Sequence, residues 1–260
     1  MDGPDGCVSL PGGWNRTLRM IPSDAKYCKI VHADDTLLPH CLERMTEVAE
    51  RNPSVAIVTS YALWGDDVRH LGVPYPVEVV DGRDVCRSTL LGRYYVFGSP
   101  SSLLLRATDI RTRPTFYNDE NFHSDTEVCF DLLRDADLGF VHQILTRTRV
   151  HEEAMTSFAV SVNTFHHGWL AIHLKYGREF LKPQEYYGRL AYRLCRYAVY
   201  LAKSVIKAKF RDPRFRKHHG RTLRFLFRSA ASRARRAEER SPVRPQTPLT
   251  DDGEHRTRRS

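Results

Sequence analysis

The sequence predicts an α/β fold with a mixed β-sheet and flanking helices, and three observations lead to this prediction. An apolar run at residues 27–31 stops at His32-Ala33-Asp34-Asp35, as a strand does when it reaches a polar edge of a sheet. Residues 39–52 then have the apolar spacing of a helix. A second apolar run, residues 55–58, reads as a buried strand. Strand, loop, helix and strand in this succession are typical of α/β proteins.

The elements can be placed along the chain in order. Pro39 suits the first turn of a helix, and Asn52-Pro53 ends that helix. Asp84 is a candidate N-cap for a helix through Leu91. From N- to C-terminus we expect a short helix at 12–21, a strand at 27–32, a helix at 39–52, a strand at 55–58, a loop at 62–82, a helix at 84–91, a strand at 103–105, a loop at 111–122, a helix at 124–135, strands at 138–141 and 144–150, and helices at 158–210 and 219–238.

Length and composition limit the classes of protein. With 260 residues and 41% hydrophobic residues, the chain can build one or two domains with a proper core. No stretch approaches the roughly 18 uninterrupted apolar residues of a membrane span, and the N-terminus lacks the pattern of a signal peptide. The six cysteines are scattered without a Cys-x-x-Cys pair, which predicts reduced thiols rather than a zinc site or disulfides. We therefore expect a cytoplasmic protein.

Charge is distributed unequally. Residues 1–169 carry 16 Lys and Arg against 23 Asp and Glu, a net −7, whereas residues 170–260 carry 24 against 8, a net +16. The first part resembles an ordinary enzyme domain. The second is attracted to polyanions, which are anionic lipid or nucleic acid. No zinc spacing, RNA-binding box or helix-turn-helix pattern is present, so nucleic acid is the less favoured partner.

The basic region also has helical periodicity. On a helical wheel, apolar residues gather on one side and basic residues on another. One interpretation is a helix that lies on the anionic inner face of a membrane. The other is a helix that packs on the first part of the chain, the enzyme-like domain, with its basic face in water. A second basic helix at 219–238 favours the membrane. The apolar set is Tyr187, Leu194, Tyr197, Ala198, Leu201 and Val205, and the basic set is Arg189, Arg193, Arg196, Lys203 and Lys207.

The polar residues after the first strand form the first candidate site. In α/β sheets, ligands bind beyond the carboxyl ends of strands, and carboxylates there can hold a divalent cation that bridges to substrate phosphates. His32, Asp34 and Asp35 are such a set. The alternative is a solvated turn in which Asp35 or Thr36 caps the next helix.

Two further positions are candidates for chemistry. Ser124-Asp125-Thr126-Glu127 fits a capping box, with Ser124 as N-cap and Glu127 at N3. Asp125 lies in the first turn, where the helix dipole favours its ionised form, so it can also act as a general base. His151 becomes a metal ligand if its loop folds back toward the aspartates.

Several segments, in the right order, resemble inverting family-2 glycosyltransferases of the GT-A fold. Lys29-Ile30-Val31-His32-Ala33-Asp34-Asp35-Thr36-Leu37-Leu38-Pro39 is similar to the Asp-x-Asp region of that family. The same holds for Asn52-Pro53-Ser54-Val55-Ala56-Ile57-Val58, for Gly98-Ser99-Pro100-Ser101-Ser102-Leu103-Leu104-Leu105-Arg106, for His123-Ser124-Asp125 and for Arg149-Val150-His151. The resemblance covers roughly residues 12–157.

The resemblance implies transfer of a sugar from a nucleotide-sugar donor to a hydroxyl of a saccharide or lipid-linked acceptor. Asp34 and Asp35 would hold Mg²⁺ or Mn²⁺ on the donor diphosphate, with His151 completing the shell. Asp125 would take the proton of the acceptor hydroxyl. Asn15 and His32 would lie at the donor. The acceptor loop would contain Gly98, Ser101 and Ser102.

The chain departs from the family in two ways. His32 stands where the family has the first Asp of its motif, and only 26 residues precede Tyr27, where the family has a nucleotide-binding βαβ half. We therefore expect a partial catalytic domain at 1–157, lacking that half, a basic helical extension at 158–240 and a disordered tail at 241–260. The alternative function is an inactive, truncated relative that binds anionic membranes through its basic helices.

Overall fold

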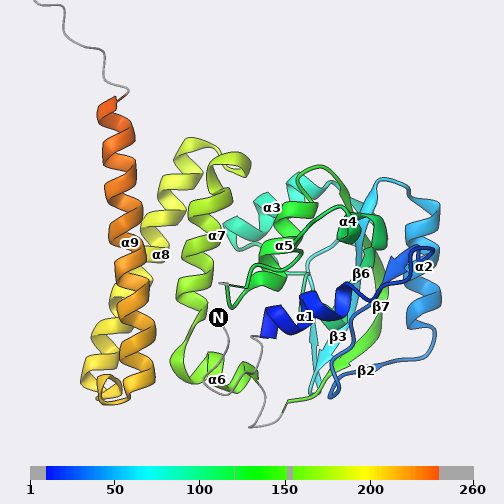
Figure 1. Ribbon diagram of the computed structural model, residues 1–260, viewed down its shortest axis with the longest axis horizontal. Helices are drawn as coiled ribbons and strands as arrows, with labels where there is room; N and C mark the ends of the chain where they lie inside the picture. Colours follow the sequence, from blue (N-terminus) through cyan, green and yellow to red (C-terminus); the bar gives the residue numbers. More distant parts are fainter. Residues whose placement is uncertain (1–9, 120, 151–154, 240–260) are drawn as a thin grey trace, which may run out of the picture.

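The computed structural model describes residues 10–119, 121–150 and 155–239, and it confirms a mixed sheet flanked by helices (Figure 1). The sheet has seven strands in its described part, in the order β1-β6-β3-β7-β2, with β4 paired to β3 and β5 to β7. β3 and β7 run parallel and the other pairs are antiparallel. The strands are β1 Tyr27–Cys28, β2 Thr36–Leu37, β3 Val55–Trp64, β4 Asp67–Arg69, β5 Val79–Val80, β6 Leu104–Arg106 and β7 Asp137–Thr148.

The first strand is much shorter than predicted. The expected strand at 27–32 is β1, a two-residue edge strand antiparallel to β6. The chain then leaves the ladder at Lys29, whose ammonium group donates to the Leu103 carbonyl (3.3 Å). His32, Asp34 and Asp35 therefore lie in a loop beyond an edge strand, and not at the carboxyl end of a parallel central strand.

The last strand is longer than predicted, because the two expected strands at 138–141 and 144–150 are the single strand β7. Its pairing with β3 shifts register between Ser60 and Tyr61 and between Tyr61 and Ala62. Such irregularities let one strand continue past a local change of register. The expected loop at 62–82 likewise contains the end of β3 and two short strands, β4 and β5.

Most helices begin and end within a few residues of the predicted positions. Asp81, and not Asp84, caps α3: its carboxylate accepts from the Asp84 N–H (2.9 Å). The expected helical region 158–210 is three helices, interrupted at Asn163, which has a left-handed φ of 58°, and again at residues 181–182, before Pro183 starts the last of them. The helices are α1 Leu10–Leu18, α2 Cys41–Arg51, α3 Gly82–Leu91, α4 Ala107–Arg111, α5 Ser124–Leu132, α6 Met155–Val162, α7 Phe165–Phe180, α8 Pro183–Ile206 and α9 Pro213–Glu239. Short 3-10 turns occupy Pro100–Ser102 (η1) and Lys209–Arg211 (η2).

Two apolar clusters hold these layers together. The larger one joins the sheet to α3, α5 and α7 through side chains such as Leu90, Phe130 and Tyr176. The smaller one packs α2 on the sheet through Met45 and Val48. α8 and α9 lie on the side of α7 that faces away from the sheet (Figure 1).

The predicted boundary between 157 and 158 falls within α6, and the predicted tail 241–260 lies outside the described residues.

None of the helices in the described ranges is both long and apolar enough to cross a membrane.

Candidate functional site

The loop after β1 gathers the three polar residues that the sequence singled out. Ligand atoms of His32, Asp34 and Asp35 all lie within 4.8 Å of one another. Imidazole Nδ1 of His32 is 3.7 Å from Oδ2 of Asp35. The Asp35 side chain is only 3% exposed, whereas Asp34 is exposed. The loop thus has an inner carboxylate, an outer carboxylate and an imidazole around one point.

Two segments far away in the sequence fix His32 in place. Its backbone N–H donates to the Ser101 hydroxyl (3.0 Å), and Ser101 lies in the buried turn η1. On another side, the Trp14 indole of α1 stacks on the imidazole, with ring centroids 5.5 Å apart and an interplanar angle of 12°. The sequence prediction missed Trp14, although it lies next to Asn15 in a helix that the prediction included.

The donor set fits a divalent cation. His32 Nε2 and Asp35 Oδ2 are both buried, and neither has a hydrogen-bond partner. A buried polar atom without a partner is costly, typically by about 1–3 kcal/mol, and such atoms require an explanation. Opposite oxygen ligands of Mg²⁺ are about 4.2 Å apart, at ~2.1 Å from the ion each. Little movement is needed to bring the three side chains to that spacing.

Asn15, expected at the donor, has a different environment. Its amide donates to the Tyr117 carbonyl (2.7 Å) and accepts from the Tyr117 N–H (2.8 Å), so it pairs with the backbone as a neighbouring strand would. The amide also donates to Asp119 Oδ1 (2.8 Å). Asn15 is 8% exposed. These contacts tie α1 to the loop before α5, and through α1 they position Trp14 over His32.

We expect Asn15→Ala to lower the free energy of unfolding by about 2–4 kcal/mol, because it leaves a buried peptide N–H and C=O without partners. Urea denaturation measures the change. Thr17→Ala, which removes only an exposed hydroxyl bonded to its own helix, is the matched control and should change stability little. If Asn15→Ala unfolds like the wild type but loses nucleotide binding, Asn15 lines the donor pocket instead.

The Gly98 turn and the start of α5 are joined by one tyrosine. The Tyr95 hydroxyl lies 2.8 Å from Thr126 Oγ1 and 3.4 Å from the Gly98 carbonyl. Burial raises the pKa of Tyr95 well above its usual value, so the hydroxyl keeps its proton. Gly98 has a φ of 66°, and a Cβ there would lie 2.7 Å from Ser102 Oγ, so glycine is required. Tyr95 was not among the predicted site residues.

Asp125 has the electrostatics of a general base. The residue is half-buried at the N-terminal end of α5, and desolvation of its carboxyl raises its pKa to about 6. The Thr126 N–H donates to Asp125 Oδ1 (2.7 Å), and this hydrogen bond lowers the pKa and so opposes part of the increase. A carboxylate with a pKa near neutrality is ionised at pH 7 and still accepts a proton readily.

The predicted capping box does not form. His123 is the N-cap, Ser124 is the first helical residue, and its buried hydroxyl has no hydrogen-bond partner. Glu127 instead pairs with Lys175 of α7 (2.6 Å) and accepts from Asn121 (2.6 Å). The helix starts one residue earlier than the cap requires, and the Glu127 carboxylate instead accepts hydrogen bonds from the Asn118 and Asn121 amides.

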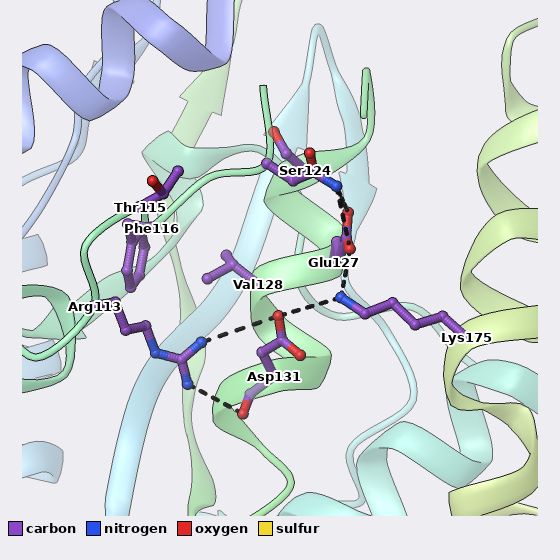
Figure 2. A pocket seen from close by; sticks show the side chains of 9 residues that line it. Arg113, Thr115, Phe116, Ser124, Glu127, Val128, Asp131 and Lys175 are labelled. Carbon is purple, nitrogen blue, oxygen red and sulfur yellow. Dashed lines mark hydrogen bonds and ion pairs between the residues drawn. The ribbon is translucent and has the colours of Figure 1, made fainter. Parts of the chain in front are cut away.

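Glu127 and Lys175 line a cavity of about 320 Å³ between α5, α7 and the loop 113–118 (Figure 2). Its charges compensate one another: Lys175 also approaches Asp131 (3.7 Å), which Arg113 approaches from the other side (4.0 Å). The cavity contains none of His32, Asp34 and Asp35. The ion pairs that line the cavity therefore link α5 to α7, and the cavity is separate from the candidate cation site.

His151, the predicted additional metal ligand, lies outside the described residues.

Comparison with known proteins gives a similarity of fold alone. No family model matches the chain, and no curated protein matches it. Among solved structures, the crystal structure of S. aureus TarS 1-349 is similar at 12% identity and a TM-score of 0.45, over 69% of this chain and 48% of that one. The crystal structure of S. aureus TarS is similar at 13% identity and 0.45, over 71% and 30%. TarS is a family-2-type glycosyltransferase. The chain thus spans about half of the first structure and under a third of the second, and no argument about chemistry rests on this similarity.

Proposed function

We propose that this chain carries the cation-binding and acceptor-activating part of a glycosyltransferase that uses a nucleotide-sugar donor. The observation that carries the proposal is the loop after β1, where His32 and Asp35 have buried polar atoms without hydrogen-bond partners beside the carboxylate of Asp34. His32, Asp34 and Asp35 would hold a hard cation there, which would suit the diphosphate of the donor. When bound, it offsets the negative charge that develops on the departing nucleoside diphosphate.

The donor atoms favour Mn²⁺ over Mg²⁺. Carboxylate oxygens suit both ions, but imidazole is a ligand for transition metals and a poor one for Mg²⁺. His32 offers an imidazole nitrogen that lies within 4.8 Å of the ligand atoms of Asp34 and Asp35. Its ring orientation is fixed by the Trp14 stack, so the nitrogen is held in place before any cation arrives. Preorganisation of this kind reduces the ordering that binding must otherwise impose.

Asp125 is the proposed base. It takes the proton of the acceptor hydroxyl while that oxygen attacks the anomeric carbon and the bond to the diphosphate breaks, so the configuration at that carbon inverts. Gly98, Ser101 and Ser102 form the proposed acceptor turn, and Tyr95 ties Gly98 of this turn to Thr126, the residue after Asp125. The acceptor is a saccharide or lipid-linked hydroxyl. The chain spans only part of the solved structures that it resembles, so a complete nucleotide-binding pocket is itself part of what we propose.

The test is release of nucleoside diphosphate from a panel of nucleotide-sugars in the presence of Mn²⁺ and saccharide acceptors. We expect Asp125→Asn to lower kcat/KM at least ~100-fold, because general base catalysis contributes at least that much. Since the pKa of Asp125 is about 6, the wild-type rate should rise with pH below 6 and level off above pH 7. Asp84→Asn, at an exposed position on α3, is the matched control and should keep the wild-type rate. A rate and pH profile unchanged by Asp125→Asn would exclude this residue as the base.

A further inference from the structure

The outer side of α8 is apolar, and no part of the chain within residues 10–119, 121–150 and 155–239 covers it. Five large side chains lie there: Tyr187 is 59% exposed, Leu194 39%, Val199 53%, Val205 64% and Ile206 85%. On a helix, Tyr187, Leu194 and Val205 share one line, and Val199 and Ile206 share the next. The residues between the two lines are small, exposed and not charged: Ala191, Cys195, Ala198 and Ala202. We call these nine residues the apolar stripe.

The inner side of α8 is occupied by the rest of the protein. Arg189 Nε and Arg193 Nη2 both donate to the Leu90 carbonyl at the end of α3 (3.2 and 3.1 Å). These two arginines were predicted to belong to an outward cationic face, and that prediction is wrong. The Tyr197 hydroxyl is buried against His219 of α9 (2.9 Å). The apolar residues of α8 therefore divide between a packed inner side and the uncovered apolar stripe.

A basic stripe runs beside the apolar one. Arg196, Lys203 and Lys207 are exposed and spaced by seven and four residues, which places them on one line next to Val199 and Ile206. The following helix repeats this combination, since Phe227 is 74% exposed between the exposed Arg224 and Arg228. From residue 186 to residue 237 the sequence has 16 Lys and Arg, and Asp212 is its one acidic residue.

We infer that the apolar stripe and its basic border form a docking surface for an anionic lipid bilayer. A helix with an apolar side flanked by Lys and Arg lies in the interfacial plane, with its apolar side among the acyl chains and its cations at the headgroups. Each cation near the surface adds to the attraction. The proposal goes beyond sugar transfer, because it assigns a location to the chain through residues that the site does not use.

The same observations disfavour two other occupants. A second copy of the chain, docked through the same stripe, would bring two basic borders together, and like charges in contact oppose association. Nucleic acid would neutralise the cations but would leave Val199, Val205 and Ile206 against water or phosphate. An anionic bilayer satisfies both the charge and the apolar surface.

The experiment is flotation of the purified full chain with two kinds of vesicle, phosphatidylcholine alone and phosphatidylcholine with phosphatidylglycerol. We expect binding to the anionic vesicles, weakened by salt, and none to the neutral ones. Val205→Ser/Ile206→Ser should weaken binding at least ~10-fold through lost apolar insertion. Lys203→Glu/Lys207→Glu should weaken it at least ~30-fold. All four side chains are exposed, so the fold should persist, which circular dichroism checks.

The matched control is Arg16→Glu/Arg19→Glu, which makes the same change in net charge at two exposed positions, one in α1 and one just after it. It should change vesicle affinity less than ~3-fold, because surface potential acts locally. Equal losses in the control and in Lys203→Glu/Lys207→Glu would overturn the docking surface. The docking surface would also be overturned if Val205→Ser/Ile206→Ser bound anionic vesicles as well as the wild type does, or if the chain bound RNA more tightly than anionic vesicles. A third contrary result would be a dimer that Val205→Ser/Ile206→Ser dissociates, with no vesicle binding by either form.

Discussion

Alanine in place of Asp35 is expected to abolish Mn²⁺ binding and to lower sugar transfer more than ~1,000-fold. A cation at a departing phosphate supplies several kcal/mol of charge stabilisation, and each 1.36 kcal/mol is about tenfold in rate. Asp35 is the inner carboxylate of the site, with a side chain that is 3% exposed and an Oδ2 atom without a hydrogen-bond partner. Titration calorimetry with Mn²⁺, with and without nucleoside diphosphate, measures the loss.

The same substitution should have the opposite effect on stability without metal. In the absence of metal, the buried Oδ2 of Asp35 has no hydrogen-bond partner, so Asp35→Ala should raise the free energy of unfolding by about 1–3 kcal/mol. In the wild type, Mn²⁺ should raise the unfolding temperature, and in the variant it should not. Functional sites commonly show this exchange of stability for binding.

Two other variants sharpen the test. Asp24→Ala removes an exposed carboxylate in the loop before β1 and should leave Mn²⁺ affinity unchanged. His32→Asp converts the set to oxygen ligands alone and should shift preference from Mn²⁺ toward Mg²⁺. If Asp35→Ala binds Mn²⁺ within threefold of the wild type, the cation site lies elsewhere.

How far the sequence predicts this site depends on the distance along the chain between the parts. His32, Asp34 and Asp35 could be found because they are neighbours in one loop, so their proximity follows from the sequence itself. Ser101 lies 69 residues after His32, and its contact with the His32 N–H depends on how η1 packs. Asn15 and Tyr117 are 102 residues apart, so nothing local in the sequence indicates that the Asn15 amide pairs with that backbone.

The fold shows the same division between local and long-range causes. α2 and the first half of β3 follow from their own apolar patterns, and the structure confirms both. The length of β1 could not be predicted, because the same apolar residues suit a longer strand, whereas in the structure the pairing stops after Cys28 and the Lys29 side chain bonds to the Leu103 carbonyl. In α8 the helical period was evident, yet periodicity does not say which side packs inward. Arg189 and Arg193 face inward because the Leu90 carbonyl at the end of α3 accepts hydrogen bonds from them.

Acid is expected to unfold the C-terminal helices, because they pack around five histidines, of which one is buried and four are half-buried. His123, His166, His167, His218 and His219 come from the loop before α5, from α7 and from α9. The rings of His167 and His218 are 5.8 Å apart, and His219 Nε2 lies 2.9 Å from the Val162 carbonyl. Burial lowers the pKa of all five, to about 4 for His123, His166 and His218.

The sign of the pH effect follows from these shifts. A histidine in the unfolded chain has a pKa near 6.5, so between about pH 6.5 and pH 4 the unfolded chain binds protons that the folded protein does not. Stability is therefore fully present above pH 6.5 and is lost as the pH falls toward 4. Arg196, Lys209 and Arg221 lie close enough to lower these pKa values further.

Three histidines with a pKa of about 4 should together lower the free energy of unfolding by about 4 kcal/mol or more between pH 7 and pH 5. That is a large part of the roughly 5–15 kcal/mol that stabilises a typical protein. Urea denaturation at the two pH values measures the difference. His166→Phe/His218→Phe should reduce it by about 1–2 kcal/mol per histidine, because neither state then binds those protons.

His40→Gln, at an exposed position beside Glu43, should leave the difference unchanged. Equal stability at pH 7 and pH 5 would mean that the imidazoles are not buried as the packing of α7 on α9 requires. Hydrogen exchange at the two pH values also locates the change, since α9 holds two of the five histidines and should lose protection before the sheet does.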